Sequence, residues 1–348
     1  MIPKPYFNSK GEVLSLIDYM RLKKISDWSY ESTTKAYEPT GGANGAYGGF
    51  IYALSAWAAA QTVQAGLTIH SISGNFILGG IPSETFKLDI SKIRDGGNYS
   101  SRYVTATQSK GICFTALVSF KRPEKSRVEM QDKVDIHKQF AVALRHAHTP
   151  FDHPESPSMG SQWFAEVYLP THPEHYNPLP ALHLRQANMS TYNSSLKPID
   201  RRSLAFYSLR GKIPRTSEYA NLHAIAHLFA SDRNSLFVIP RHLGVGMELK
   251  RTASLSHTVI FHVHLDQMLM GDEPPGRNSK SPPTENWGDG EADEEGRKWY
   301  VQESWMTRAG GGRGLHHSRI WEPETGVHVA TTIQDGLVRF AERREVKL

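Results

Sequence analysis

The chain has 348 residues, of which 39% are hydrophobic and 22% are charged, and its formal net charge is +5. This composition is typical of a globular protein and excludes a disordered or fibrous chain. No apolar run approaches the roughly 18 residues of a membrane-spanning helix, and no basic stripe gathers the positive charge, so we expect neither a membrane span nor a nucleic-acid partner. The single cysteine, Cys113, excludes an internal disulfide and fits a reducing compartment.

The first half of the chain is predicted to hold one long helix and an antiparallel sheet. Residues 1–27 indicate an N-terminal helix, and residues 28–37 a first strand. A glycine-rich turn at 41–49 leads into a helix over 50–63, FIYALSAWAAAQTV, whose alanines allow close packing. Apolar alternation and turn signals then predict four strands, at 67–78, 84–94, 99–108 and 112–120.

A connection rich in proline and histidine follows at 126–199, with a short helix predicted near 134–146. Histidines are common zinc ligands, but these are irregularly spaced and no cysteine accompanies them. We therefore expect no metal site in this connection.

From residue 200 the order of the first half returns. A strand at 204–209 and a helix at 218–231 are followed by four further predicted strands, at 253–265, 298–308, 315–321 and 327–338. Arg94 and Gly111 are 17 residues apart, and their counterparts Arg308 and Gly326 are 18 apart. The acidic tract 271–296, rich in proline and glycine, is expected to be a flexible surface insertion.

This repetition predicts an α+β protein made by tandem duplication of one unit, in which a helix lies on an antiparallel sheet. The predicted domain boundaries are 1–125 for the first unit, 126–199 for the connection, and 200–348 for the second unit with its insertion.

Several polar residues are candidates for chemistry, and each has a structural alternative. Asp232 ends the helix at 218–231 as either a solvated terminus or a placed acid or base, and Gln334 is either a solvent-facing strand residue or a functional one. Ser254 lacks the GxSxG context of a nucleophile, and Cys113 lies in an apolar strand that favours a core role. His262 and His264 share one face of a strand, which favours polar packing over metal binding because no third ligand is evident.

Motifs in both halves carry a family resemblance. In the first half these are Gly48-Gly49, His70-Ser71, RDGGNYSSRYVTATQ (94–108) and ALVSFKRPE (116–124). In the second half they are ASDRNSL (230–236), ASLSHTVIFH (253–262), RGLHHSR (313–319) and VATTIQDGLVR (329–339). In order and spacing the chain resembles the type II acyl-CoA thioesterase family, whose members carry two fused hotdog domains.

The resemblance implies a tandem double hotdog fold, each half with a central helix packed on an antiparallel sheet. It also implies hydrolysis of acyl-CoA to free acid and CoA in lipid and fatty acid metabolism, without a cofactor or metal, by a self-associating protein. The family's active-site aspartate, hydroxyl residue and glutamine fall on Asp232, Ser254 and Gln334. The hydroxyl residue is usually threonine in the family. In that scheme the three residues activate a water, and no covalent acyl-enzyme forms.

The three residues are chemically suited to this task. Thioester hydrolysis needs a base for water, groups that orient the water, and donors for the oxyanion. Asp232 is the base, Ser254 and Gln334 orient the water, and amides at the start of a helix, near Gly48-Gly49 or Ala220, are candidate oxyanion donors.

Two departures from the family pattern leave alternatives open. Leu78-Gly79-Gly80 replaces Arg-Pro-Gly, and Ser256 replaces the aspartate before His257. One alternative is a hotdog enoyl-CoA hydratase or dehydratase that uses His257 or His262. The other is a catalytically silent module that binds acyl-CoA or an acyl carrier.

Val346-Lys347-Leu348 is similar to the Ser-Lys-Leu signal of peroxisomal import, although valine replaces the small residue. The expected location is therefore cytoplasmic or peroxisomal.

Overall fold

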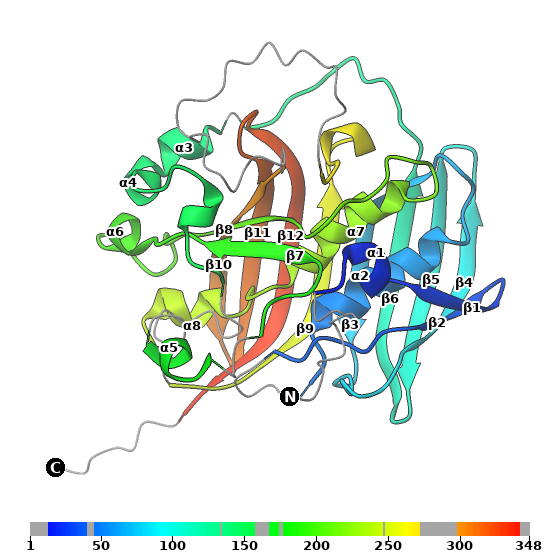
Figure 1. The fold of residues 1–348 in the computed structure, drawn as a ribbon, viewed down its shortest axis with the longest axis horizontal. Helices are drawn as coiled ribbons and strands as arrows, with labels where there is room; N and C mark the ends of the chain where they lie inside the picture. The colour runs from blue at the N-terminus through cyan, green and yellow to red at the C-terminus, as the bar shows by residue number, and fades with distance from the viewer. Residues whose placement is uncertain are drawn as a thin grey trace.

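One antiparallel sheet runs through both halves of the chain (Figure 1). The computed structural model describes residues 13–39, 45–132, 134–156, 167–173, 177–245, 248–271 and 298–341. In these residues the sheet has twelve strands in the order β1-β2-β4-β5-β6-β3-β9-β12-β11-β10-β8-β7.

The first half supplies six neighbouring strands of this sheet. They are β1 (Leu22–Ser26), β2 (Ser29–Ser32), β3 (Thr68–Phe76), β4 (Lys87–Asp95), β5 (Tyr99–Gln108) and β6 (Gly111–Lys121). Alternation of side chains decides which face is buried, because successive strand residues point to opposite faces. In β5, for example, Val104 and Ala106 are fully buried, whereas Tyr103 is 37% exposed.

The second half repeats this arrangement with the strand order reversed. Its strands are β7 (Leu182–Gln186), β8 (Ser203–Leu209), β9 (Leu249–Phe261), β10 (Tyr300–Gly310), β11 (Arg313–Glu322) and β12 (Val327–Phe340). The halves join where β3 pairs with β9, from Ser71 opposite Ile260 to Asn75 opposite Ser256. Each half is thus one hotdog unit, and the predicted α+β duplication is confirmed.

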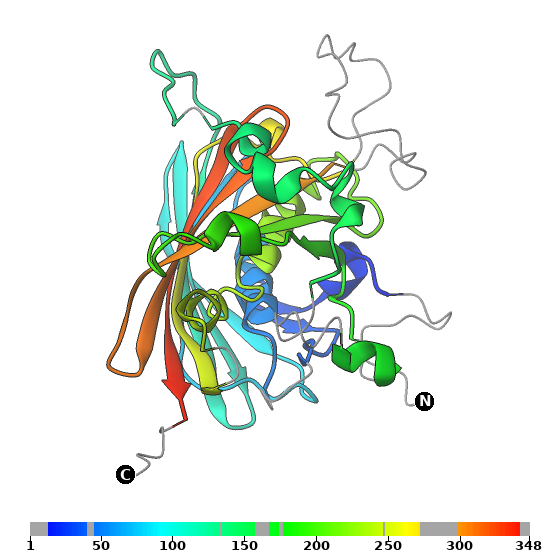
Figure 2. The ribbon, with the colours of Figure 1, turned by 90° about the vertical axis from the view of Figure 1, so that its left-hand side faces the viewer.

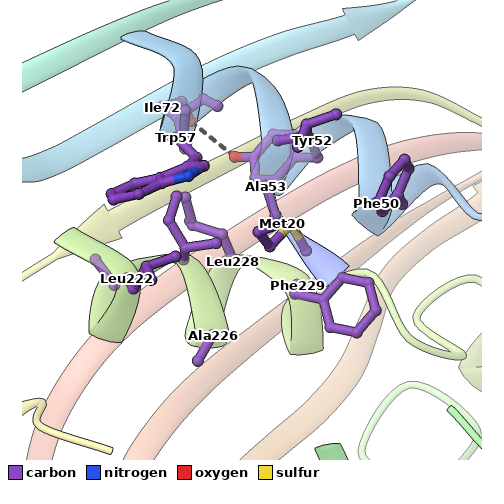
Figure 3. Close-up of a cluster of buried hydrophobic side chains, with 14 of the residues drawn as sticks. Met20, Phe50, Tyr52, Ala53, Trp57, Ile72, Leu222, Ala226, Leu228 and Phe229 are labelled. Atoms are coloured by element: carbon purple, nitrogen blue, oxygen red, sulfur yellow. Dashed lines mark hydrogen bonds between the residues drawn. The ribbon is translucent and has the colours of Figure 1, made fainter. Parts of the chain in front are cut away.

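Two long helices, α2 (Gly48–Ala60) and α7 (Ala220–Ser231), lie side by side on one face of the sheet (Figures 1 and 2). Figure 3 shows their contact, where Trp57 of α2 faces Leu222 of α7. Phe229 of α7 lies next to Met20, which follows the short N-terminal helix. The alanines of α2 let the helix approach the sheet closely, and the Tyr52 hydroxyl donates to the Ile72 carbonyl of β3 at 3.0 Å. The shared core of both halves lies between the helices and the sheet.

The ends of the sheet differ from the prediction. In the described part of the helix expected over 1–27, residues 13–27, the helix is the single turn α1 (Leu16–Tyr19), and Leu22–Ser26 is instead the edge strand β1, paired with β2. Residues 1–12 lie outside the described residues. The apolar residues of this segment are too few and too loosely spaced for a long amphipathic face, and lysines on β1 suit an edge.

The connection between the halves also carries a strand, because β7 within 126–199 pairs with β8 at the far edge. The short helix expected near 134–146 forms as α3 (Ile136–Gln139) and α4 (Ala141–Leu144). The remaining short helices are η1 (Pro150–Asp152), α5 (Leu169–Thr171), α6 (Ser190–Asn193), α8 (Val238–Leu243) and η5 (Leu265–Gln267). The insertion expected at 271–296 falls, after Gly271, outside the described residues.

Across the described ranges, every helix is too short or too polar to cross a bilayer.

Gly74 of β3 lies where the neighbouring side chains leave no room for a larger residue. A Cβ added to Gly74 would lie 2.2 Å from the ring of the buried Phe114. We expect Gly74→Ala to lower the free energy of unfolding by about 1–3 kcal/mol through overpacking. Urea unfolding measures the change, with Gly310→Ala as the control because that strand position is open. Equal stability of the two variants would contradict the packing described here.

Candidate active site

Asp232 lies at the point where α7 ends, as the residue that caps its C-terminus. Its side chain points back into the molecule, and the residue is only 8% exposed. The solvated-terminus interpretation of Asp232 is therefore wrong, because the carboxylate is enclosed by groups from both halves of the chain.

The structure brings the three predicted residues together, and we call them the polar trio. The Gln334 amide nitrogen donates to Asp232 Oδ1 at 2.5 Å and to Ser254 Oγ at 2.7 Å. The Ser254 hydroxyl lies 3.4 Å from the same Asp232 oxygen. A register shift between β9 and β12 next to Asp335 helps to bring Ser254 and Gln334 to one place.

The first half contributes the start of α2 to this site. The backbone N–H of Gly49 donates to the Asp232 carboxylate, and a Cβ on Gly48 would lie 2.8 Å from Asp232 Oδ2. Tyr47, which precedes the helix, donates its hydroxyl proton to the Phe229 carbonyl of α7 at 2.6 Å. The site therefore forms only where the two halves meet. Ala220, the other predicted source of amides, lies at the opposite end of α7.

Burial dominates the electrostatics of Asp232. It raises the pKa of the carboxyl from 3.8 to about 6, although hydrogen bonds from Gln334, Gly49 and Ser254 and the charge of Arg233 act in the opposite direction. A carboxyl group with this pKa is mostly ionised at pH 7 and remains a stronger base than an exposed one.

The other candidate residues have structural partners. The side-chain partners of Ser254 among the described residues are Asp232 and Gln334. The serine–histidine pair that activates a serine nucleophile is therefore not formed at Ser254. Cys113 is 3% exposed, and burial raises the pKa of its thiol, which disfavours the reactive thiolate. Both observations disfavour a serine or cysteine nucleophile at these two residues.

The histidines named as alternatives do not pair with Asp232. His257 is fully buried with its Nε2 atom 2.8 Å from the Ser231 hydroxyl, and burial lowers its pKa to about 3. His262 contacts the Thr331 hydroxyl, whereas His264 contacts the Glu124 carbonyl, so the two rings do not converge. Within the described ranges, no group of three His, Cys, Asp or Glu side chains is placed to hold a metal ion.

Two aromatic residues of the site were missed by sequence reasoning. Tyr47 and Tyr52 are fully or almost fully buried near the Asp232 charge, which together with burial raises the pKa of each phenol. Their position beside the Gly48-Gly49 motif could have marked both tyrosines as site residues. However, nothing in the sequence of α2 predicts that this helix meets the end of α7.

The strand order and the paired helices define the class of protein as a double hotdog. Acyl-CoA thioesterase II TesB2 of Mycobacterium marinum shares the fold with a TM-score of 0.62 and 21% identity, over 94% of this chain and 99% of that one. A hot dog protein of unknown function from Alicyclobacillus acidocaldarius has a TM-score of 0.63 and 14% identity, over 94% and 98% of the two chains.

Sequence comparison adds the family. Residues 37–121 match the sequence model of the acyl-CoA thioesterase N-terminal domain. The chain is 21% identical over 335 residues to acyl-CoA thioesterase 2 of Haemophilus influenzae, covering 94% of this chain and 98% of the relative. It is 24% identical over 301 residues to acyl-coenzyme A thioesterase 8 of Mus musculus, covering 84% and 80%. These similarities confirm the resemblance of the motifs to the type II acyl-CoA thioesterase family.

The raised pKa of Asp232 predicts a pH-dependent stability. The folded state holds this proton more tightly than the unfolded chain, so the contribution favours folding below about pH 4 and is lost as pH rises through about 6. Asp232→Asn removes the charge, and we expect the variant to gain stability relative to wild type across this interval, by on the order of 2–3 kcal/mol. Urea unfolding of both proteins between pH 4 and 8 measures the gain. A stability difference that does not change with pH would contradict the raised pKa.

Proposed function

We propose that the chain hydrolyses acyl-CoA thioesters with a water activated by Asp232, Ser254 and Gln334. The observation that carries this proposal is the buried Asp232 carboxylate, which is held by two side chains of the second half and faces the start of α2 from the first half. Similarity to acyl-CoA thioesterases supports acyl-CoA as the substrate class.

The geometry supports a division of roles within the trio. Both amide hydrogens of Gln334 are used, one on Asp232 and one on Ser254, so Gln334 orients its two partners. The Ser254 hydroxyl directs its proton toward Asp232 Oδ1 over a long 3.4 Å bond. A water bound beside Asp232 accepts this hydrogen bond in exchange, so that Ser254 and the Asp232 carboxylate hold the water together. Asp232 accepts one proton as the water oxygen bonds to the thioester carbon.

The tetrahedral intermediate carries a negative charge on the former carbonyl oxygen. The Gly49 N–H donates to Asp232, so the neighbouring amide of Gly48, at the start of α2, is the one suited to stabilise that charge, because the start of a helix carries a partial positive charge. Collapse of the intermediate breaks the carbon–sulfur bond. The CoA thiolate leaves and takes the proton from Asp232, which restores the carboxylate.

The first prediction for this mechanism concerns the base. Asp232→Asn is expected to lower kcat by about 10²–10⁴-fold, because an amide does not accept the proton. Ser254→Thr keeps the hydroxyl and should retain activity, whereas Ser254→Ala should lose it in part. Release of thiol from acyl-CoA measures these rates, and circular dichroism checks the fold. Full activity of Asp232→Asn would reject the assignment.

A second prediction concerns the start of α2. Gly48→Ala places a methyl group 2.8 Å from Asp232 Oδ2 and 3.0 Å from the Phe76 ring. We expect kcat to fall about tenfold or more because the carboxylate or the helix must move, and small displacements at a reacting centre are costly. Gly79→Ala is the control, since a Cβ there meets no described atom within 4 Å. An equal effect of the two substitutions would argue against the role given to α2.

The rival functions are separated by the same assay with a panel of acyl-CoAs. A hydratase would change the absorbance of an enoyl-CoA without releasing thiol, and a silent module would bind CoA esters without turnover. The Ser231 partner of His257 disfavours the hydratase, which needs a histidine free to work with an acid.

Assembly and location are further parts of the proposal. Hotdog units commonly associate through their sheets, which supports self-association of the chain. The peroxisomal alternative rests on Val346-Lys347-Leu348, which lies outside the described residues. Sedimentation in solution tests self-association, and a monomer would count against it. Import of a fluorescent fusion tests the location, and a fusion that stays in the cytoplasm would reject the peroxisomal alternative.

A further inference from the structure

Hydrogen bonds hold the Gln334 side chain through its amide nitrogen and not through its amide oxygen. Its amide nitrogen donates to Asp232 and Ser254, but its amide oxygen is buried and has no partner among the described residues. An unpaired buried carbonyl is costly, and reversal of the amide would place its oxygen against the Asp232 carboxylate. A further hydrogen-bond donor to the amide oxygen would therefore favour the orientation in which the Gln334 nitrogen faces Asp232.

The register of the sheet places a histidine on each side of Gln334. His257 of β9 and His316 of β11 lie directly opposite it, so the three side chains share the face that the helices cover. His257 and His316 are fully buried. The Nε2 atom of His257 is engaged with the Ser231 hydroxyl. Both ring nitrogens of His316, by contrast, are without a partner in the described part of the chain.

Two buried, unsatisfied and complementary groups thus stand side by side on neighbouring strands. A neutral imidazole has one N–H donor, and the Gln334 amide oxygen needs one. We infer that His316 is a positioning residue for Gln334: its ring N–H is linked to the Gln334 amide oxygen through one buried water, and so fixes the amide with its nitrogen toward Asp232 and Ser254. This inference rests on the proposed function of the trio.

The electrostatics around His316 are consistent with a neutral ring. Burial lowers its pKa well below the usual range, and so do the neighbouring imidazoles His317 on its own strand, His257 on β9 and His242 on α8. The ring therefore stays uncharged over the working pH range and acts through its N–H alone.

The inference predicts a change in the protonation of Asp232. The titratable groups that face this carboxylate are Arg233 beside it and Tyr47 and Tyr52 from α2, and substitution of His316 alters none of them. If the Gln334 amide loses its orientation, the Asp232 carboxylate loses a donor and its pKa rises. The acid limb of the kcat/KM profile then moves to higher pH.

The test is His316→Leu, assayed by thiol release across pH 5–9. We expect kcat to fall about tenfold, the worth of one such hydrogen bond, with KM little changed and the acid limb shifted upward. His316→Asn and His316→Gln keep an uncharged N–H, and at least one of them should restore the wild-type pH profile. A loss that is the same in all three variants, or a leucine variant with the wild-type profile, would overturn the inference.

A double-mutant cycle and a matched control separate positioning from packing. In a Gln334→Leu background, His316→Leu should cost nothing further in kcat, because the two residues act through one water-mediated link. If the leucine variant does not fold, His316→Phe serves in the same cycle. His223→Leu is the control: His223 is another fully buried histidine with one unpaired nitrogen, and it bonds the Met270 amide away from the trio. It should lower stability and leave the pH profile unchanged.

The outcomes also distinguish this inference from the proposed function. Absence of thiol release by the wild-type chain, or full activity of Asp232→Asn, rejects the hydrolase itself. Hydrolysis that depends on Asp232 but shows additive effects of His316→Leu and Gln334→Leu rejects only the positioning role.

Discussion

The pairing of β3 with β9 is the constraint on which the site depends. It relates the halves by an approximate two-fold axis near the pair Ile72 and Val259, so α2 and α7 run in opposite directions on the same face. The start of α2 then meets the end of α7. A carboxylate at the end of its own helix is unfavourably placed in the field of that helix, and here the positive end of the neighbouring helix compensates. One strand pair thereby determines where a buried negative charge is tolerated.

The chemistry of the site follows from a balance between desolvation and hydrogen bonding. Burial raises the pKa of Asp232, the donors from Gln334, Gly49 and Ser254 act in the opposite direction, and the resulting pKa is about 6. The same desolvation keeps nearby imidazoles such as His257 and His316 neutral. These histidines contribute dipoles to the interior and no positive charge, so they do not neutralise the base.

Much of the fold was predictable because its central strands alternate clearly and its two long helices have apolar faces. The edge strands β1 and β7 were not, since short polar strands depend on a neighbour for their hydrogen bonds and carry little pattern of their own. The trio could be placed through motifs on α7, β9 and β12. The roles of Tyr47 and the Gly49 amide could not, because they come from the other half, and sequence spacing does not report a contact across nearly two hundred residues.

The duplication has left the two halves unequal at equivalent positions. Where α7 ends in Asp232, α2 ends in Gln61, whose amide is turned back onto its own helix at the Trp57 carbonyl. At the start of α7, the Asn221 side chain accepts from the Ile69 N–H and donates to the Leu67 carbonyl. A symmetric pair of separate hotdog chains would carry two identical centres. Within its described residues the fused chain keeps the polar arrangement at one of the two equivalent positions, so the proposed reaction would have one centre per 39.0 kDa polypeptide.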